Sequence, residues 1–508
     1  MLKKVLDWSS VLFFLILFLV FLQALKDPVD LDLGWHLRYG EYFFRHGYVL
    51  KDNILSFVWP DYKWVQASWG YDLLVYMVFK TFGFFGLSFV GALITIAIFL
   101  ILVFRKNLSI SLFLFLAFIF VTQTAPLYGS GLRSQTPSAL LFTLALVSYF
   151  WLKKKLNEST LKGWQFLVLP LIFLVWANMH GGFAVGLVLL WVMFAGEIGV
   201  LILRKFKKGI TAFKFKSFLK LGLILLLCSV VPLINPWGLR LYEESFQHTS
   251  NINLTAIAEW MPLTVASFEW YLALFVVVLV VLVFLKRRKL EDLPFMLGFG
   301  LAAYLGFSAT RFLIIFGIMT VFYLASNMQG KLKWTWQTGM AIIVIFVIVL
   351  DFFALKNYFS FPSRKLLNFD WNDYCQVIYI EGGKAKDCSE EVTQVMLVDP
   401  PTGNGYHPYN YGGYLTWRVP EVKTFIDGRM VAWERDGRTP PVLDGDRIMT
   451  EKIPVSFRLF DSKYRFGWMI VPTPSAVTSY LDNLVKSGVW QLRYRDEFYS
   501  YYIRRHEK

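Results

Sequence analysis

Charged residues are scarce in this sequence. Asp, Glu, Lys and Arg make up 17% of its 508 residues, whereas soluble domains carry about a quarter. Hydrophobic residues reach 56% and aromatic residues 18%, a balance that excludes an ordinary water-soluble globular protein. Three cysteines and unremarkable numbers of glycine (35) and proline (19) exclude a disulfide scaffold, a collagen-like chain and a disordered chain. The apolar residues stand in long uninterrupted runs, as in a protein that crosses a membrane several times.

Eleven apolar runs predict transmembrane helices, each near the ~20 residues that a bilayer requires. They lie at about 9–25, 84–104, 108–124, 138–152, 164–178, 183–203, 217–233, 270–285, 293–307, 311–327 and 338–355. The stretch 68–83 is shorter and more polar, which predicts an amphipathic helix at the membrane surface. The first run follows two lysines and lacks a small-residue cleavage site, so we expect an uncleaved anchor. The sequence therefore predicts a multi-pass protein of the cell membrane.

Basic residues produce a net charge of +15 and gather in short clusters between the apolar runs. If successive spans alternate sides, one set of loops holds roughly three times as many Lys and Arg as the other, which marks it as cytoplasmic. This bias predicts a cytoplasmic N-terminus and an extracytoplasmic chain after the last span. Because the basic residues form no single solvated face, we expect no nucleic-acid partner.

A change in composition divides the chain near residue 355. Residues 1–355 are predicted to form the transmembrane domain, with an outer loop at 26–67, and residues 356–508 to form an extracytoplasmic α/β domain. Within the second part, strands are predicted at 395–398, 423–426, 468–471 and 499–503, and a helix at 475–487. Cys375 and Cys388 lie in the same part, where oxidation is permitted, so both a disulfide and two free thiols remain open.

Two carboxylates open the predicted outer loop. Asp30 and Asp32 follow the first span closely, and the aromatic-rich residues after them predict an amphipathic helix. Asp32 would stand at the start of this helix, where a carboxylate can cap backbone amides. A carboxylate at the membrane surface can also accept a proton from an acceptor hydroxyl while a lipid-borne leaving group departs. Spacing alone leaves both roles of Asp32 open.

The loop resembles that of the GT-C glycosyltransferases, multi-span membrane enzymes that use polyprenyl-phosphate-linked sugars. Their first outer loop begins with an aspartate, continues with an amphipathic helix and reaches a glycine at the separation that Asp32 and Gly47 have here. The likeness extends to a bacterial branch with an Asp-Leu-x-Trp-His-Leu-Arg-Tyr-Gly loop and an outer Phe-Ile-Asp-Gly-Arg segment, here Phe425 to Arg429. One departure is Leu33, which stands where the family has a second acidic residue.

This resemblance implies a GT-C-like fold and transfer of a sugar from a polyprenyl-phosphate donor. The acceptor would be a glycan, a lipid or a protein outside the cytoplasm, and Asp32 would be the general base, with Asp30 as its substitute. Arg311 and Arg133 stand on the predicted outer side, against the positive-inside bias, and would bind the donor phosphate through their guanidinium groups. The alternative for each arginine is a bond to backbone carbonyls at a helix end.

Three further residues are candidates for substrate binding: His36, His180 and Glu259. His180 follows Asn178-Met179 and precedes two glycines, where it serves either a ligand or the turn itself. His36 follows Asp32 by four residues and would share its helical face, so Asp30, Asp32 and His36 would offer three ligands to a divalent metal ion. No fourth ligand is visible, and no other cofactor is expected.

Two other classes of function remain open. A transporter or flippase for a lipid-linked sugar would also need many spans, although the sequence shows no internal repeat of the kind such proteins carry. A non-catalytic assembly factor that retains the scaffold is the second alternative, and Leu33 favours it, since a second acidic residue is missing there.

Overall fold

The structure is a computed structural model that describes residues 8–104, 108–128, 131–206, 214–250, 257–328, 365–380, 383–431, 433, 440–450, 453 and 455–505. The chain divides into two compact units. The first, called the helical unit below, comprises Met1–Asp27, Gly86–Ser245 and Thr255–Arg364. The second, called the mixed unit, comprises Pro28–Phe85, Phe246–Leu254 and Lys365–Lys508. The predicted outer loop thus shares a unit with the C-terminal part of the chain, and the predicted boundary at residue 355 lies outside the described residues.

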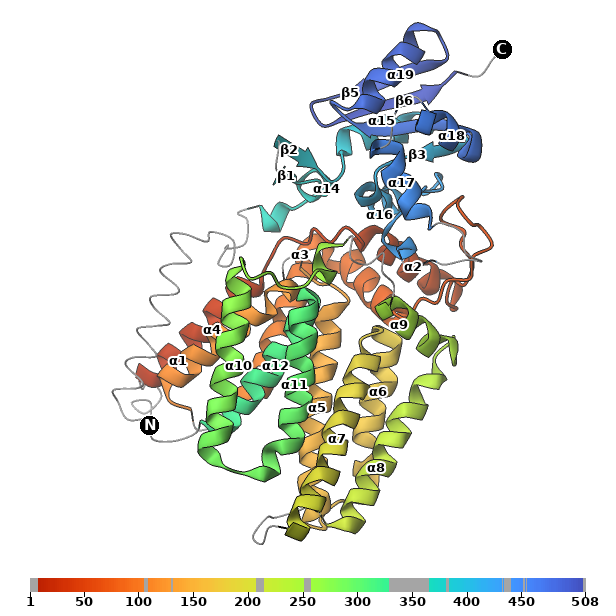
Figure 1. Ribbon diagram of the computed structural model, residues 1–508. Coiled ribbons are helices and arrows are strands. Elements are labelled where there is room, and N and C mark those ends of the chain that lie inside the picture. The colour runs from red at the N-terminus through yellow and green to blue at the C-terminus, as the bar shows by residue number, and fades with distance from the viewer. Residues whose placement is uncertain are drawn as a thin grey trace. The chain divides into compact units, whose positions relative to one another are not determined.

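Apolar helices make up the helical unit, and Figure 1 shows several of them side by side. They are α1 (Trp8–Ala24), the second part of α3 (Trp69–Val103), α4 (Ile110–Tyr128), α5 (Gln135–Asn157), α6 (Val168–Met179), α7 (Phe183–Phe206), α8 (Phe215–Val230), α10 (Phe268–Arg287), α11 (Leu293–Ser308) and α12 (Leu313–Asn327). Helix α9 (Arg240–Ser250) comes after α8 in the chain, and the division between the two units falls within it, after Ser245. One group of helices that pack on one another consists of α5, α6, α7 and α8. Helix α12 packs on α4 and α11, and α11 also packs on α7.

Seven helices in the described part of the chain are long and apolar enough to cross a membrane. They are Trp69–Val103, Gln135–Asn157, Phe183–Phe206, Phe215–Ile234, Phe268–Arg287, Leu290–Ser308 and Thr310–Asn327, and shorter apolar helices cover Val11–Ala24, Ile110–Thr124 and Gly163–Met179. The multi-span helical class predicted from the sequence is confirmed. The count of eleven spans is not, since three of the predicted spans are short helices and 338–355 lies outside the described residues.

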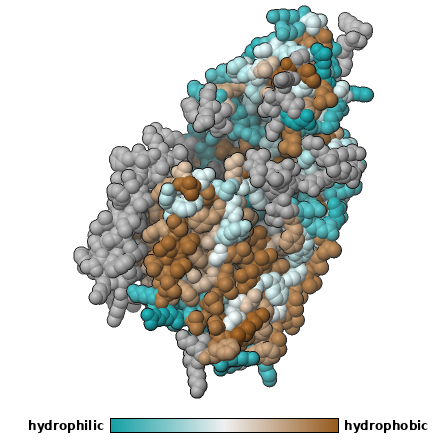
Figure 2. All heavy atoms as spheres, viewed as in Figure 1, coloured by the Kyte–Doolittle hydropathy of each residue, from teal (hydrophilic) through white to brown (hydrophobic). Residues whose placement is uncertain are grey.

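Large apolar side chains cover the outward faces of these helices. Phe14 is 69% exposed, Leu223 67% and Leu285 57%, and Figure 2 shows hydrophobic residues spread over the face of the helices that is turned to the viewer. Apolar surface of this extent is unfavourable in water but is expected where a helix faces lipid.

Helix α3 breaks at Gly83. This residue has φ 60° and ψ −154°, a conformation that only glycine adopts readily. The break separates the helix predicted at 68–83, which belongs to the mixed unit, from the predicted span that follows it.

The mixed unit combines helices with two small sheets. Its helices are α2 (Leu33–His46), the first part of α3, α14 (Trp371–Tyr374), α15 (Glu390–Val398), α16 (Tyr409–Arg418), α17 (Pro441–Thr450), α18 (Val455–Tyr464) and α19 (Ala476–Lys486). Strands β1 (Val377–Ile380) and β2 (Gly383–Lys386) form an antiparallel hairpin. Strands β3 (Asn404–Tyr406), β4 (Phe466–Pro472), β6 (Tyr499–Arg504) and β5 (Trp490–Arg495) form a second sheet in that order. A disulfide joins Cys375 to Cys388, which settles the question that the sequence left open.

Two of the predicted strands are wrong. Residues 395–398 end helix α15, because Ser389 caps it by accepting from the Val392 N–H at 3.2 Å and two glutamates occupy the first turn. Residues 423–426 form no regular strand and make only a single bridge, between Ser56 and Thr424. The strands predicted at 468–471 and 499–503 and the helix predicted at 475–487 are confirmed as β4, β6 and α19.

Candidate functional site

Helix α2 carries the aspartate that the sequence selects as the catalytic base. Asp32 is the N-cap residue of the helix, and Gly47 is its C-cap in the left-handed conformation, with φ 78°. The Gly47 N–H donates to the carbonyl of Phe43 at 2.8 Å, which closes the last turn. The amphipathic helix expected between these two residues is therefore present with the expected bounds.

The Asp32 side chain does not cap the helix. It makes no hydrogen bond to the backbone amides of the first turn, so the capping role considered from the sequence is wrong for this side chain. Instead, the indole N–H of Trp35 donates to Asp32 Oδ1 at 2.9 Å. The carboxylate also lies against the Cα of Gly428, where an added Cβ would come within 2.8 Å of Asp32 Cγ and still closer to Oδ1. Asp32 is partly exposed, and the Trp35 indole and the Gly428 backbone both lie against its carboxylate.

Asp30 is more enclosed than Asp32 and supports the start of the helix. Its side chain is buried, and Oδ1 lies 3.4 Å from the Asp32 N–H that donates to it. Its carbonyl accepts from the Leu33 N–H at 2.9 Å and from the hydroxyl of Tyr374. Burial raises the pKa of Tyr374, and the carboxylates of Asp30 and Asp32 raise it further, so this hydroxyl remains a neutral donor.

Helix α2 packs on α16 without an intervening side chain. An added Cβ on Gly34 would clash with the carbonyl of Gly413, and one on Gly413 would clash with the carbonyl of Leu31. Arg38 strengthens the contact, because its guanidinium donates to the carbonyls of Thr416 at 3.2 Å and Trp417 at 3.1 Å, at the end of α16. These bonds satisfy carbonyls that the helix leaves without partners at its C-terminus.

The segment from Phe425 to Arg429 lies beside the same end of α2. Asp427 and Arg429 form an ion pair with 0% exposure of either side chain, and Arg429 also donates to the Tyr39 hydroxyl at 3.3 Å. Residues Gly428–Met430 form a single 3₁₀ turn that Asp427 caps. This turn brings Gly428 against Asp32.

The side chain of His407 binds the backbone of this segment. Its side chain is buried, Nε2 accepts from the Phe425 N–H at 2.8 Å, and Nδ1 lies 3.0 Å from the carbonyl of Pro408. This pair of bonds requires the neutral ring with its proton on Nδ1. Burial lowers the pKa of His407 to about 4, although Pro408 and Asp427 act in the opposite direction.

The three residues considered as metal ligands are not assembled. His36 faces Asp72, with 2.5 Å between Nδ1 and Oδ1, and Gln66 donates to the other oxygen of Asp72 at 2.6 Å. Among the described residues, no group of three or more His, Cys, Asp or Glu side chains is placed to hold a metal ion. The set of Asp30, Asp32 and His36 therefore does not fit a divalent ion, because His36 is turned to a different carboxylate.

In the helical unit, both candidate phosphate-binding arginines contact the same carboxylate. Arg133 precedes α5 and Arg311 lies in the turn before α12, and their guanidinium groups lie 3.3 Å and 3.4 Å from the two oxygens of Glu259. The Arg311 guanidinium also stacks on Trp260, 4.1 Å from the ring centre. Both guanidinium groups thus contact the same carboxylate, and all three side chains are partly exposed.

His180 belongs to the turn between α6 and α7. Its Nδ1 accepts from the Gly182 N–H at 3.0 Å and lies 3.1 Å from the hydroxyl of Ser138, which in turn accepts from the indole N–H of Trp176 at 2.7 Å. These contacts join the His180 ring to the turn and to helix α5.

Neither a protein-family model nor a curated protein matches this sequence. Solved structures do match in fold. The archaeal oligosaccharyltransferase AglB from Archaeoglobus fulgidus, in complex with an inhibitory peptide and a dolichol-phosphate, has a TM-score of 0.61 at 11% identity over 92% of this chain and 69% of that chain. ArnT from Cupriavidus metallidurans, bound to undecaprenyl phosphate, has a TM-score of 0.54 at 11% identity over 97% of both chains. Both are GT-C glycosyltransferases, so the GT-C fold expected from the sequence is confirmed.

The A. fulgidus oligosaccharyltransferase has also been solved in complex with zinc and sulfate, with a TM-score of 0.53 at 12% identity over 90% of this chain and 68% of that chain. At this identity the likeness shows the fold of the present chain alone.

The mixed unit should lose stability on acidification because His407 must become charged. Its pKa is about 4 in the folded chain, against an ordinary 6.5, so the folded state binds fewer protons. The stabilisation is complete above about pH 6.5 and falls by roughly 3 kcal/mol as the pH decreases to about 4. Chemical unfolding of the full chain in detergent, followed by fluorescence across this range, measures the effect. His407→Asn should be less stable at pH 7 but should show a flatter profile, and identical profiles for both proteins would contradict the assignment.

Proposed function

We propose that the protein is a membrane glycosyltransferase that transfers a sugar from a polyprenyl-phosphate donor to a glycan, lipid or protein acceptor outside the cytoplasm. The observation that carries this proposal is the Asp32 carboxylate, which is partly exposed, makes no capping bond and is aimed by Trp35 and Gly428. The GT-C fold supports it, since solved proteins of this fold hold dolichol-phosphate and undecaprenyl phosphate.

In the proposed reaction, Asp32 is the general base. The acceptor hydroxyl or amide gives its proton to the carboxylate, its oxygen or nitrogen forms a bond to the anomeric carbon, and the bond from that carbon to the phosphate oxygen breaks. The electron pair of the broken bond leaves with the polyprenyl phosphate. A positioned base of this kind contributes about 10²- to 10⁴-fold in rate. Asp30 would substitute for Asp32 only in part, because its carboxylate is buried.

Arg133 and Arg311 would bind the phosphate that leaves. Both arginines contact Glu259, and a guanidinium matches phosphate oxygens with two parallel N–H groups. Glu259 would hold both arginines in place until the more highly charged phosphate binds. Stabilising charge on a leaving group is among the largest contributions to catalysis.

The proposed arrangement in the membrane follows from the distribution of charge along the chain. The N-terminus would be cytoplasmic, and residues 356–508 would form an extracytoplasmic domain together with the outer loop 26–67. Span alternation would then place Asp32, Arg133 and Arg311 on the same side of the membrane. His36 and His180 would act through the side chains that they orient, and not as direct ligands of the substrate.

A non-catalytic assembly factor is the second candidate, and Leu33 is the observation that favours it. This residue stands where related enzymes have a second acid, and it is 1% exposed in the first turn of α2. An apolar, buried residue at this position leaves Asp32 as the base without an adjacent carboxylate.

Replacing Asp32 by Asn should abolish transfer while the protein remains abundant and folded. The amide retains the size of the carboxylate but cannot accept a proton at neutral pH, so turnover should fall by about 10²- to 10⁴-fold. The product is identified by mass spectrometry as the glycoconjugate that disappears from cells lacking the protein and returns with the wild-type chain.

Asp52→Asn is the matched control, because Asp52 lies in the same predicted loop and pairs with Lys63 at the surface. It should restore the product fully. Full restoration by Asp32→Asn would exclude the enzyme and favour an assembly factor or a transporter.

Gly428→Ala should reduce transfer by displacing the Asp32 carboxylate. The added methyl group would overlap Oδ1, so the carboxylate must turn away from the position that Trp35 fixes. A shift of about 1 Å in a reacting group can cost on the order of 10²-fold in rate. Gly163→Ala is the control, since nothing lies within 4 Å of a Cβ at that position. Wild-type turnover in Gly428→Ala would show that the position of Asp32 does not matter.

Arg311→Lys should weaken use of the donor more than it slows turnover at saturation. Lysine keeps the charge but loses the forked N–H groups and the stack on Trp260, so we expect the KM for the lipid-linked sugar to rise about tenfold. Steady-state kinetics with the polyprenyl-phosphate-linked form of the sugar found in that product provide the measurement. Arg240→Lys, at an exposed arginine outside this cluster, should behave as wild type, and an unchanged KM in Arg311→Lys would remove Arg311 from the phosphate site.

A further inference from the structure

A basic pocket is lined by residues other than those that the proposed reaction uses. It occupies about 380 Å³ between the end of α5 and the start of α8. Its lining consists of Leu156, Ser159, Leu161, Lys214, Phe215, Lys216, Ser217 and Lys220. Three of these eight residues are lysines and none is acidic, so the pocket attracts an anion.

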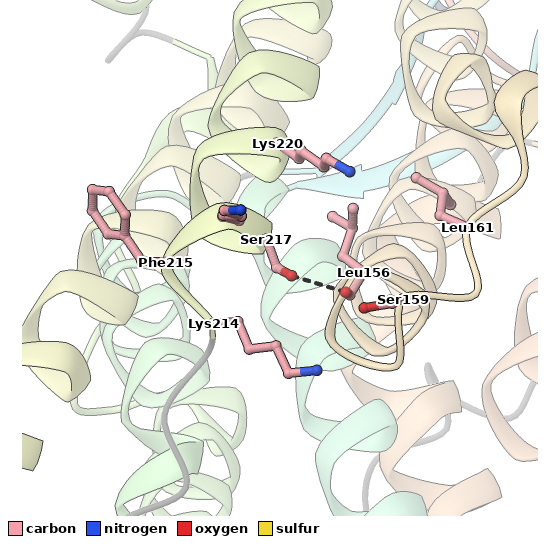
Figure 3. A pocket seen from close by; sticks show the side chains of 8 residues that line it. Leu156, Ser159, Leu161, Lys214, Phe215, Ser217 and Lys220 are labelled. Atoms are coloured by element: carbon pink, nitrogen blue, oxygen red, sulfur yellow. Dashed lines mark hydrogen bonds between the residues drawn. The ribbon is translucent and has the colours of Figure 1, made fainter.

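The walls of the pocket are held together by a defined contact. The buried hydroxyl of Ser217, in the first turn of α8, donates to the carbonyl of Leu156 in the last turn of α5 at 2.8 Å. Figure 3 shows this bond, with the side chains of Lys214 and Lys220 extending from the α8 side toward the segment that carries Ser159 and Leu161. In this view the Ser217–Leu156 bond lies between the two lysines, so it joins the two sides of the pocket.

The pocket lies at the ends of two apolar helices, which is the depth expected for a lipid headgroup. Helices α5 and α8 each belong to a segment that is long and apolar enough to cross a membrane, Gln135–Asn157 and Phe215–Ile234, and the pocket lies where one ends and the other begins. Trp164 and Phe215 are 66% and 65% exposed close to it along the chain. Exposed aromatic residues at the ends of spans are typical of the interface between lipid and water.

We propose that this pocket binds the phosphate of an anionic membrane lipid. Lysine ammonium groups supply the charge, while Leu161 and Phe215 offer apolar surface to the part of the lipid below the phosphate. Basic pockets between spans are typical of such headgroup sites on the cytoplasmic side, and the charge bias predicts that this end of the helices is cytoplasmic. The site therefore lies on the opposite predicted membrane face from Asp32 and does not depend on the proposed reaction.

The experiment is a lipid titration of the full chain in a neutral detergent. Energy transfer from tryptophan to dansyl-labelled phosphatidylglycerol reports binding, and dansyl-labelled phosphatidylcholine is the uncharged reference. The variant Lys214→Gln/Lys220→Gln should bind the anionic lipid about 30-fold more weakly, since each of the two lysines near a surface contributes on the order of 1 kcal/mol. Lys214→Arg/Lys220→Arg should bind as wild type.

Lys154→Gln/Lys205→Gln is the matched control. It removes the same charge from the ends of α5 and α7 but spares the pocket, and its affinity should stay within about twofold of wild type. An equal loss in both double variants would mean that only general surface charge attracts the lipid, which overturns the proposal. Displacement of the lipid by inorganic phosphate at millimolar concentration would also overturn it, because the site would then take a soluble anion. Unchanged affinity in Lys214→Gln/Lys220→Gln would overturn the proposal as well.

Discussion

The contact between helix α2 and helix α16 is the constraint on which the candidate active site depends. Two glycines, Gly34 and Gly413, let the backbones touch, and Arg38 closes the end of α16 with two hydrogen bonds to its carbonyls. With α2 fixed in this way, the indole of Trp35 and the Cα of Gly428 define where the Asp32 carboxylate can lie. The motif that begins at Asp32 therefore supplies the aspartate and also the residues that fix its position.

A buried ion pair also stabilises the position of helix α2. Asp427 and Arg429 are fully enclosed, and such a pair costs several kcal/mol of desolvation that only good geometry recovers. Here the geometry includes two guanidinium bonds to Asp427, at 2.8 Å and 2.6 Å, and one to the Tyr39 hydroxyl on α2. Burial acts to lower the pKa of Arg429, but Asp427 and Tyr39 outweigh it and raise the pKa above its ordinary value. The pair remains charged and ties the segment beside Gly428 to helix α2.

The sequence predicted local features well and long-range pairing poorly. Helix α2, its two end residues and the break in α3 follow from short-range rules: a helix-terminating glycine, an amphipathic pattern and a change from polar to apolar residues. The contact of Asp32 with Gly428 joins residues almost four hundred positions apart, and no local pattern marks it. The outer segment Phe425 to Arg429 stands out in the sequence only through its resemblance to a family, and nothing in its composition links it to the aspartate. The pairing of His36 with Asp72 is equally long-range, and the local spacing of His36 from Asp32 suggests a metal site instead.

Binding of the carrier lipid tests the central claim most directly. A structure determined with a bound polyprenyl phosphate should place the phosphate against the guanidinium groups of Arg133 and Arg311. The Asp32 carboxylate should then face the side of the phosphate from which a sugar acceptor approaches. A phosphate bound away from both arginines, or an Asp32 side chain sealed off from the lipid by protein, would contradict the assignment of this aspartate as the base.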